Sequence, residues 1–514
     1  MATLVRGKYM IADAALPDLG YQENVAVRIE DGLITHIGDW TELRRNYPAD
    51  AVVGNGKQLL MPGLIDAHTH GAGLSYAQRG VHLDYLENSL LDFATAFQLP
   101  PELTAKLNAV RHIYNGCTTI HHNESGRALD PDMLDNNRKK ISGYRSTGIR
   151  LGYSLGIRNC NTLALEDENF LQTLPEPLRT QAKPQVYYDK AAAAQEYLKV
   201  FEELYRTENY DSVRIFLGPN WVQGSTDDLL LQVKQRSDEL GKLPIHLHCL
   251  QTPVQKAFGL RNYGKSLVAH LEDLGLLDDN LVLGHAVYLS EEDIDRLGNC
   301  HASVTHHPSC NLIMRNGIAP VYAMFRAGVN VALGIDEKGI NDDEDPIMEM
   351  RMMYFLHRCV GTNLTAFKAL THMDALRFAT INGAAPCGFP DMIGALRPGK
   401  CADMILVDME DILNAPWVDP NASIPWLFVR RALGRNVNTV IINGRIVMAE
   451  RQIKTIDVDL LYAQVRQAAT QGRTAQQLNY DSFLQKVKPY YQSWYSDWLK
   501  DIPFDPYYCF NSRT

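Results

Sequence analysis

Two histidines, His68 and His70, stand two positions apart at the carboxyl end of the apolar stretch Leu60–His70, LMPGLIDAHTH. Such a stretch is typical of a strand buried in a parallel sheet. Side chains two positions apart in a strand point to the same face, so both imidazoles can converge on one point. Converging neutral imidazoles suit a divalent metal ion. The alternative is a chance HxH pair on a half-exposed strand.

Further potential ligands follow later apolar segments. PIHLHC (Pro244–Cys249) offers His246 and His248 on one face, LGHAV offers His285, and VNVALGID ends in Asp336. Three histidines and an aspartate fit Zn²⁺, Fe²⁺, Co²⁺ or Mn²⁺ and leave one position open for water. Each residue alone could be an ordinary buried residue, but their joint placement at strand ends favours a metal site.

These residues need a scaffold that brings distant strands together. Eight strand-like segments alternate with helical patterns such as Asp227–Leu240 and Glu291–Leu297. Eight such repeats predict a closed (β/α)₈ TIM barrel. A doubly wound open sheet is the alternative, but no GxGxxG follows an early strand. The eight segments are Leu60–His70, Thr118–Asn123, Arg150–Gly156, Val213–Pro219, Pro244–Cys249, Leu281–Val287, Ala302–Pro308 and Val329–Asp336.

The two ends of the chain have a different sequence pattern from the alternating strand and helix segments between them. Short alternating strands with hairpin turns at Asp31-Gly32 and Asn443-Gly444 predict one small β-sandwich built from both ends. We therefore predict that residues 1–59 and 396–455 form this sandwich around a barrel at 60–395. Residues 456–514 are predicted to be a helical, aromatic-rich extension, which packs either on the body of the protein or on a neighbouring subunit.

Composition narrows the possible partners and compartments. A net charge of −10 without a basic stripe argues against a nucleic-acid partner. No apolar run has membrane-spanning length and no signal segment is visible, so we expect a cytoplasmic protein without membrane contact. The nine scattered cysteines contain no CxxC pair and are expected to be reduced thiols.

The same residues carry a family resemblance. PGLIDAHTH, the later histidines, LGID and PGKCADMILVD together resemble the amidohydrolase superfamily. HPSCNLIMRNGIAPV (His307–Val321) and IDEKGINDDEDPIMEMR are similar to its branch of s-triazine hydrolases and adenosine-type or guanine-type deaminases. The substituted-urea and thiocarbamate hydrolases of this branch fit equally well. The resemblance covers roughly residues 1–455 and implies a metal-dependent hydrolase.

The resemblance also implies roles for single residues. His68, His70, His248 and Asp336 match the metal ligands, which leaves His246 one layer deeper on the same face. His285 matches the histidine that orients and helps deprotonate the attacking water, while Asp336 accepts its proton. Two-metal relatives use a carboxylated lysine on strand four, and VRIFLGP (Val213–Pro219) has none. We therefore expect one divalent metal ion, zinc first, with iron, cobalt and manganese as alternatives.

Two departures from the family bear on the substrate. Deaminases of the branch have a glutamate three residues after the strand-five ligand, where this chain has Gln251, which cannot cycle a proton. Their PHAP-like turn after strand four is replaced by Gly218-Pro219-Asn220-Trp221. Trp221 could be an aromatic wall for a flat substrate or a packing anchor. Glu337 and Glu124 are the candidate replacement acids. With Asn220, His307 and Glu337, Trp221 completes the predicted substrate-binding set.

We therefore predict hydrolysis of a C–N bond in a small amide-like, urea-like, carbamate-like or heterocyclic compound by water that the metal activates. One alternative is a deaminase or dechlorinase of a triazine, purine or pyrimidine. The others are a two-metal hydrolase with an unusual bridging residue and a non-catalytic scaffold. A homo-oligomer is expected from the aromatic tail.

Overall fold

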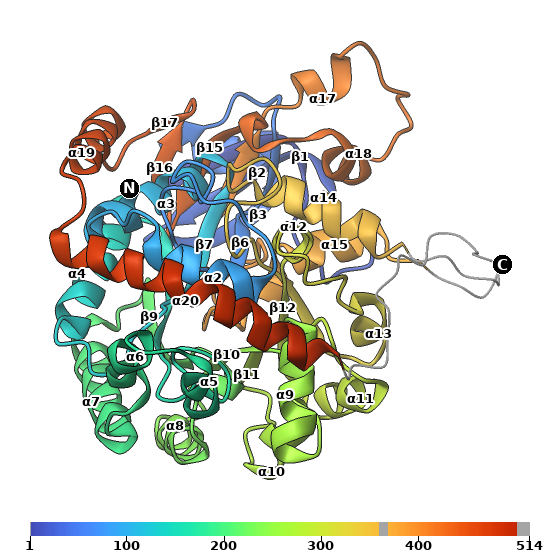
Figure 1. Cartoon of the computed structure of the whole chain (residues 1–514). Helices are drawn as coiled ribbons and strands as arrows, with labels where there is room; N and C mark the ends of the chain where they lie inside the picture. Colours follow the sequence, from blue (N-terminus) through green and yellow to red (C-terminus); the bar gives the residue numbers. More distant parts are fainter. Residues whose placement is uncertain (1, 359–368, 501–514) are drawn as a thin grey trace.

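A barrel of eight parallel strands forms the centre of the molecule, as predicted (Figure 1). The computed structural model describes residues 2–358 and 369–500. Neighbouring strands along the chain pair in parallel, and the first and last are joined by a bridge between Thr69 and Asp336. The barrel strands are β6 (Leu64–Thr69), β7 (Cys117–Asn123), β8 (Arg150–Ile157), β9 (Val213–Pro219), β10 (Ile245–Cys249), β11 (Leu281–His285), β12 (Ser303–His306) and β13 (Asn330–Leu333).

Helices surround the barrel and cover its apolar outer surface (Figure 1). Their amphipathic patterns explain the packing, because the apolar face of a helix is buried against the strands or against neighbouring helices. The helices between β6 and β14 are α2 (Leu86–Thr95), α3 (Pro101–Tyr114), α4 (Met133–Thr147), α5 (Asp167–Thr173), α6 (Leu178–Val186), α7 (Lys190–Glu208), α8 (Asp227–Glu239), α9 (Pro253–Tyr263), α10 (Leu267–Asp273), α11 (Glu291–Cys300), α12 (Pro308–Ile313), α13 (Val321–Arg326), α14 (Pro346–Leu356), α15 (His372–Phe378) and α16 (Ile381–Ala384), with the 3₁₀ turn η1 (Val222–Gly224).

A second sheet is built from both ends of the chain, as predicted. Its order is β17-β16-β15-β14-β5-β1-β2-β3, with β4 beside β1. The sheet curls so that its two predicted hairpin turns meet, and Gly32 lies against Asn443 and Gly444. A separate apolar core fills the space inside. The strands are β1 (Thr3–Met10), β2 (Gln22–Glu30), β3 (Leu33–Asp39), β4 (Ala51–Val53), β5 (Leu59–Pro62), β14 (Met404–Val407), β15 (Val437–Ile442), β16 (Arg445–Ala449) and β17 (Gln452–Ile453); the helical segments of this part are α1 (Trp40–Asn46), α17 (Glu410–Asn414), α18 (Ile424–Arg431) and η2 (Gly434–Asn436).

The prediction of one continuous strand over Leu60–His70 is wrong. Residues 59–62 form β5 of the outer sheet, where Leu60 pairs with Leu406, and only Leu64–Thr69 enters the barrel. The chain changes sheets at Gly63, where a Cβ atom would lie 2.1 Å from the side chain of Thr118. Both halves are apolar because both are buried, so hydrophobicity alone could not separate them.

The carboxyl-terminal extension is helical in its described part, through α19 (Val458–Thr470) and α20 (Ala475–Leu499). Figure 1 shows α20, in red, crossing the molecule against α2. Its apolar face, including Phe483, Val487 and Tyr491, is buried on this chain's own barrel. Lys488 also pairs with Asp92 of α2 at 2.7 Å. Residues 501–514 of the predicted extension lie outside the described residues.

Other predictions concern the cysteines and the membrane. The seven cysteines within the described ranges are free, while Cys359 and Cys509 lie outside them. Across residues 2–358 and 369–500, no helix has both the length and the apolar character needed to cross a bilayer. The domain boundaries stay predictions.

Candidate active site

The site lies on the seam that closes the barrel. The Asp336 backbone N–H donates to the His68 carbonyl at 2.7 Å, and the His70 N–H donates to the Asp336 carbonyl at 3.2 Å. Strand β6 and the residues after β13 are therefore fixed against each other by their backbones. As a result, side chains more than half the chain apart in sequence face one point at the carboxyl ends of the strands.

His70 and His248 meet directly across the barrel mouth. Their Nε2 atoms are 3.2 Å apart and their rings are nearly parallel, at 3°. Each Nδ1 contacts a backbone carbonyl, Asn123 O at 2.8 Å for His70 and Asn220 O at 2.7 Å for His248. A carbonyl can only accept, so each Nδ1 carries the proton and each Nε2 presents a lone pair.

His246 lies deeper in the barrel than His68 and orients the His68 ring by contacting its Nδ1. The His68 Nδ1 and His246 Nε2 atoms are 2.9 Å apart, and both imidazoles are buried. Asp66 strengthens the same region, because its carboxylate accepts from the backbone N–H groups of His68 and Ile335 and contacts His112 Nε2 at 2.9 Å. The hydrogen bond from the Ile335 N–H connects β6 to the loop that carries Asp336.

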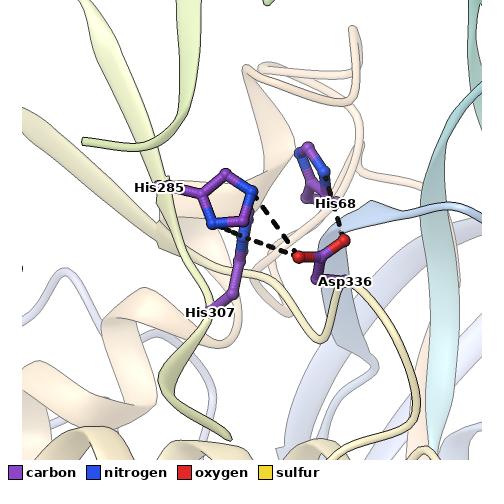
Figure 2. Close-up of side chains that lie close together, drawn as sticks. All are labelled: His68, His285, His307 and Asp336. Atoms are coloured by element: carbon purple, nitrogen blue, oxygen red, sulfur yellow. Dashed lines mark hydrogen bonds and ion pairs between the residues drawn. The ribbon is translucent and has the colours of Figure 1, made fainter. Parts of the chain in front are cut away.

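Histidines lie near both carboxylate oxygens of Asp336, and Figure 2 shows three of them, His68, His285 and His307. Its Oδ1 lies 3.7 Å from His68 Nε2 and 3.4 Å from His70 Nε2, and its Oδ2 lies 3.5 Å from His285 Nε2 and 3.6 Å from His307 Nδ1. Asp336 and His285 both have left-handed backbones, with φ of 65° and 71°. Such conformations are rare outside glycine and are concentrated at functional sites.

Burial favours the neutral form of three histidines of the site. Burial, followed by the neighbouring imidazoles, lowers the pKa of His68 and His248 well below the usual value, and burial lowers the pKa of His285. His285 Nδ1–H donates a hydrogen bond to Asn311 Oδ1 at 3.0 Å. The other ring nitrogen, Nε2, therefore faces Asp336. Neutral imidazole is the form that binds a metal ion.

The donor set fits a divalent transition-metal ion. His68, His70 and His248 each offer a nitrogen within 4.8 Å of the others, and His68, His285, His307 and Asp336 form a second overlapping group. The Nε2 atoms of His68 and His285 are buried without a hydrogen-bond partner in the described residues. Buried nitrogens without partners are costly, and coordination would satisfy them.

The predicted substrate-binding loop lies beside this group. Trp221 pairs through its backbone with His248, and its side chain packs against the apolar cluster of Leu86, Cys310 and Met314. Asn220 holds His248 through its carbonyl, while its own Oδ1 is buried without a partner. Gln251 is buried in the loop after β10, where its N–H donates to Gln255 Oε1 at 2.8 Å.

The two candidate replacement acids differ sharply. Burial favours protonation of Glu124, but Lys140 and His122 outweigh it and hold the pKa well below its usual range. Glu124 also accepts from Tyr153 and is therefore part of a fixed ionic network. Glu337 has an unpartnered buried Oε2, and burial with the nearby Asp336 charge raises its pKa to about 7. Among the described residues, Glu124 therefore has ionic partners, whereas Glu337 Oε2 has none.

The sequence argument missed several residues that contact the site. The Cys310 thiol donates to Asp336 Oδ2 at 2.8 Å, and His307 Nε2 lies 3.0 Å from Thr305 Oγ1. Asp66 was also missed, although its place two residues before His68 on the same strand face was a usable signal. The sequence carried no comparable signal for Cys310 or Thr305.

Comparison with known proteins identifies the family. The Amidohydrolase family model matches residues 59–447. The chain belongs to the amidohydrolase family. A 5-methylthioadenosine/S-adenosylhomocysteine deaminase from Caldanaerobacter subterraneus subsp. tengcongensis is 30% identical over 87% of this chain and 94% of the relative. The chain is thus an enzyme of a family that hydrolyses carbon–nitrogen bonds other than peptide bonds.

Solved structures agree with the fold of this amidohydrolase. A zinc-containing adenosine deaminase from Xanthomonas campestris superposes with a TM-score of 0.74 at 24% identity, covering 91% of this chain and 98% of that one. Atrazine chlorohydrolase from Arthrobacter aurescens, with zinc and atraton, gives 0.75 at 20% identity, covering 91% and 99%. Together with the histidine and aspartate group, these findings support a divalent metal at the site.

Proposed function

We propose that this amidohydrolase removes an exocyclic nitrogen group from a small nitrogen heterocycle by hydrolysis. The observation that carries the proposal is the group of His68, His70 and His248 nitrogens within 4.8 Å of one another, with Asp336 Oδ1 3.7 Å from His68 and 3.4 Å from His70. The similarity to a purine-nucleoside deaminase supports the heterocyclic substrate. Trp221, which follows β9 and pairs through its backbone with His248, is the aromatic residue proposed to contact a flat ring.

The proposed metal is a single zinc ion held by His68, His70, His248 and Asp336. A divalent cation in such a site lowers the pKa of a water molecule to about 7 and polarises the electrophilic carbon. Asp336 would accept a proton from the attacking water at its carboxylate, and His285 Nε2, 3.5 Å from Asp336 Oδ2, would stabilise charge that develops beside it.

Proton delivery to the leaving nitrogen is assigned to Glu337 in this proposal. Gln251 can orient a substrate by hydrogen bonding but cannot transfer a proton repeatedly. Glu337 Oε2 is free of partners, and His307 and Asn220 would contact the substrate near the same point.

Ureas and carbamates form the second candidate class, because Gln251 departs from the deaminase pattern and such substrates have no ring nitrogen to protonate. A screen of zinc-loaded protein against aminopurine nucleosides, aminotriazines, ureas and carbamates tests both, with ammonia or amine release as the readout. Turnover in any class that disappears in Asp336→Asn supports the hydrolytic site. The absence of turnover in all four classes would overturn the proposal. The cytoplasmic location and a homo-oligomer stay predictions.

A further inference from the structure

A buried carboxylate without a counter-ion lies next to the candidate active site. Glu87, the second residue of α2, is only 6% exposed. Its Oε1 accepts a hydrogen bond from Thr252 Oγ1 at 2.5 Å, and its Oε2 is buried without a partner. No cation contributes to its electrostatic environment in the described part of the chain, and burial raises its pKa to about 7. An isolated buried carboxylate is costly, which points to a use.

Glu87 lines a small cavity of ≈ 10 Å³, room for about one water molecule. Leu90, Leu165, Trp221 and Tyr495 supply apolar and aromatic walls. Gln223 and Gln255 also line the cavity; Gln255 Oε1 accepts from the Gln251 N–H, whereas Gln223 Oε1 is buried without a donor. Two oxygen acceptors of one cavity therefore lack hydrogen-bond donors.

The cavity adjoins the metal site through two connections. Trp221, in the cavity wall, pairs through its backbone with the predicted ligand His248. Leu86, the neighbour of Glu87, packs in one apolar cluster with Cys310, whose thiol donates to Asp336. Both connections are packing contacts that link the wall of the cavity to His248 and Asp336.

We propose that this cavity is a subsite for a small hydrogen-bond-donating group of the substrate, an amino or hydroxyl group, which Glu87 and Gln223 recognise. A donor would satisfy both acceptors, whereas a methyl group would leave them unpaired. Sites built in this way reject analogues that lack the donor. The inference rests on the proposed function, because it places the group on the substrate of that site.

The test compares two ring compounds of nearly the same shape, 4-(aminomethyl)pyridine and 4-ethylpyridine, by calorimetry on the zinc-loaded full chain. We expect the aminomethyl compound to bind at least about 10-fold more tightly, because hydrogen bonds to charged groups are the stronger class. In Glu87→Leu and Glu87→Gln the ratio should fall towards 1 with an unchanged zinc content. Equal affinities for the unmodified protein, or a ratio that survives both substitutions, would overturn the subsite.

Thr252→Val is the matched control, since it removes the hydrogen bond to Glu87 but keeps the carboxylate. It should retain most of the discrimination, and loss of the ratio in this variant alone would assign recognition to Thr252 instead and overturn the proposal. Binding does not require turnover. If the protein prefers the aminomethyl compound but hydrolyses no substrate of the screen, the proposed reaction is refuted and the subsite is supported. If it hydrolyses a substrate but binds both compounds equally, the subsite is refuted and the reaction is supported.

Discussion

The Nε2 atoms of His70 and His248 lie 3.2 Å apart, although 178 positions separate the two residues in sequence. Two nitrogens bound tetrahedrally at about 2.0–2.1 Å from a zinc ion are separated by about 3.3 Å. The backbone carbonyls of Asn123 and Asn220 fix both rings in this geometry. The spacing therefore belongs to the protein scaffold, which is preorganised for a metal ion.

Loss of a ligand should remove the metal. In His248→Ala we expect less than half an equivalent of zinc, because three donors remain around a site built for four. The loss in metal affinity should exceed the roughly 10- to 100-fold typical of outer-shell changes. Elemental analysis after dialysis measures it, with the exposed His82→Ala as control. A full equivalent of zinc in His248→Ala would contradict the ligand assignment.

Glu337→Gln should slow the reaction and leave the metal in place. General acid catalysis contributes about 10²- to 10⁴-fold, so kcat should fall by that factor with little change in KM. Glu124→Gln serves as the comparison, because its carboxylate holds Lys140, His122 and Tyr153. It should lower the melting temperature rather than act on kcat alone. Unchanged kcat in Glu337→Gln would assign proton transfer elsewhere.

Trp221→Ala should weaken the binding of flat substrates. We expect KM to rise about 10-fold, which corresponds to about 1.4 kcal/mol of lost contact, while Trp221→Phe retains most of the affinity. Steady-state kinetics on the best substrate of the screen measure the effect. Trp417→Ala, at a side chain with 68% exposure, is the control. Equal KM values for Trp221→Ala and the control would make Trp221 a packing anchor.

The stability gain of Glu87→Gln should depend on pH. Folding raises the pKa of Glu87 from 4.5 to about 7, so its protonated form is favoured in the folded state. The associated stability is complete below pH 4.5 and is lost as the pH rises through 7. The free energy of unfolding of Glu87→Gln, relative to that of the wild type, should therefore be higher at pH 8 than at pH 5. The difference should be up to about 3 kcal/mol, because one pK unit corresponds to about 1.36 kcal/mol.

Melting curves at both pH values measure the Glu87 effect, with the exposed Glu410→Gln as control. A gain of the same size at pH 5 and pH 8 would show that Glu87 does not titrate between them.

Helix α20 should stabilise the single chain. Phe483→Ala removes a ring that is 2% exposed, and such changes typically cost about 3–5 kcal/mol. Tyr490→Ala, on the exposed side of the same helix at 37%, should have a small effect. Denaturant unfolding at several protein concentrations separates the alternatives. A loss that appears only where the protein is oligomeric would place α20 at a subunit contact.

Much of the fold and site followed from short-range patterns. Buried strand segments with His or Asp at their carboxyl ends were sufficient to predict the barrel, and they indicated that His68 lies near His248 and near Asp336, because parallel strands end on one face. Register along the chain was harder. The apolar stretch through Gly63 is divided between two sheets. Hydropathy predicts that a residue is buried, but it does not predict which strand that residue pairs with.

Contacts made by loops could not be predicted from one sequence. The residues next to Glu87 in the sequence do not indicate that it is buried. It is buried without a counter-ion only because α2, α9 and α20 pack around it. In the same way, nothing local distinguished Glu337 from Glu124 as a free acid. The difference arises from Lys140, which reaches Glu124 from α4.

The outer sheet ties the start of the chain to its far end. Gln58 Nε2 donates to Asp408 Oδ1 at 2.8 Å across 350 positions, beside the pairing of β5 with β14. At roughly 5–20 residues per second, synthesis takes about 20–70 s to deliver the partner strand. Throughout that time the β5 edge has no neighbour on that side, and an unpaired edge invites aggregation. The nascent chain therefore keeps this sheet edge open on the ribosome until after Asp336, the last of the predicted metal ligands, has been synthesised.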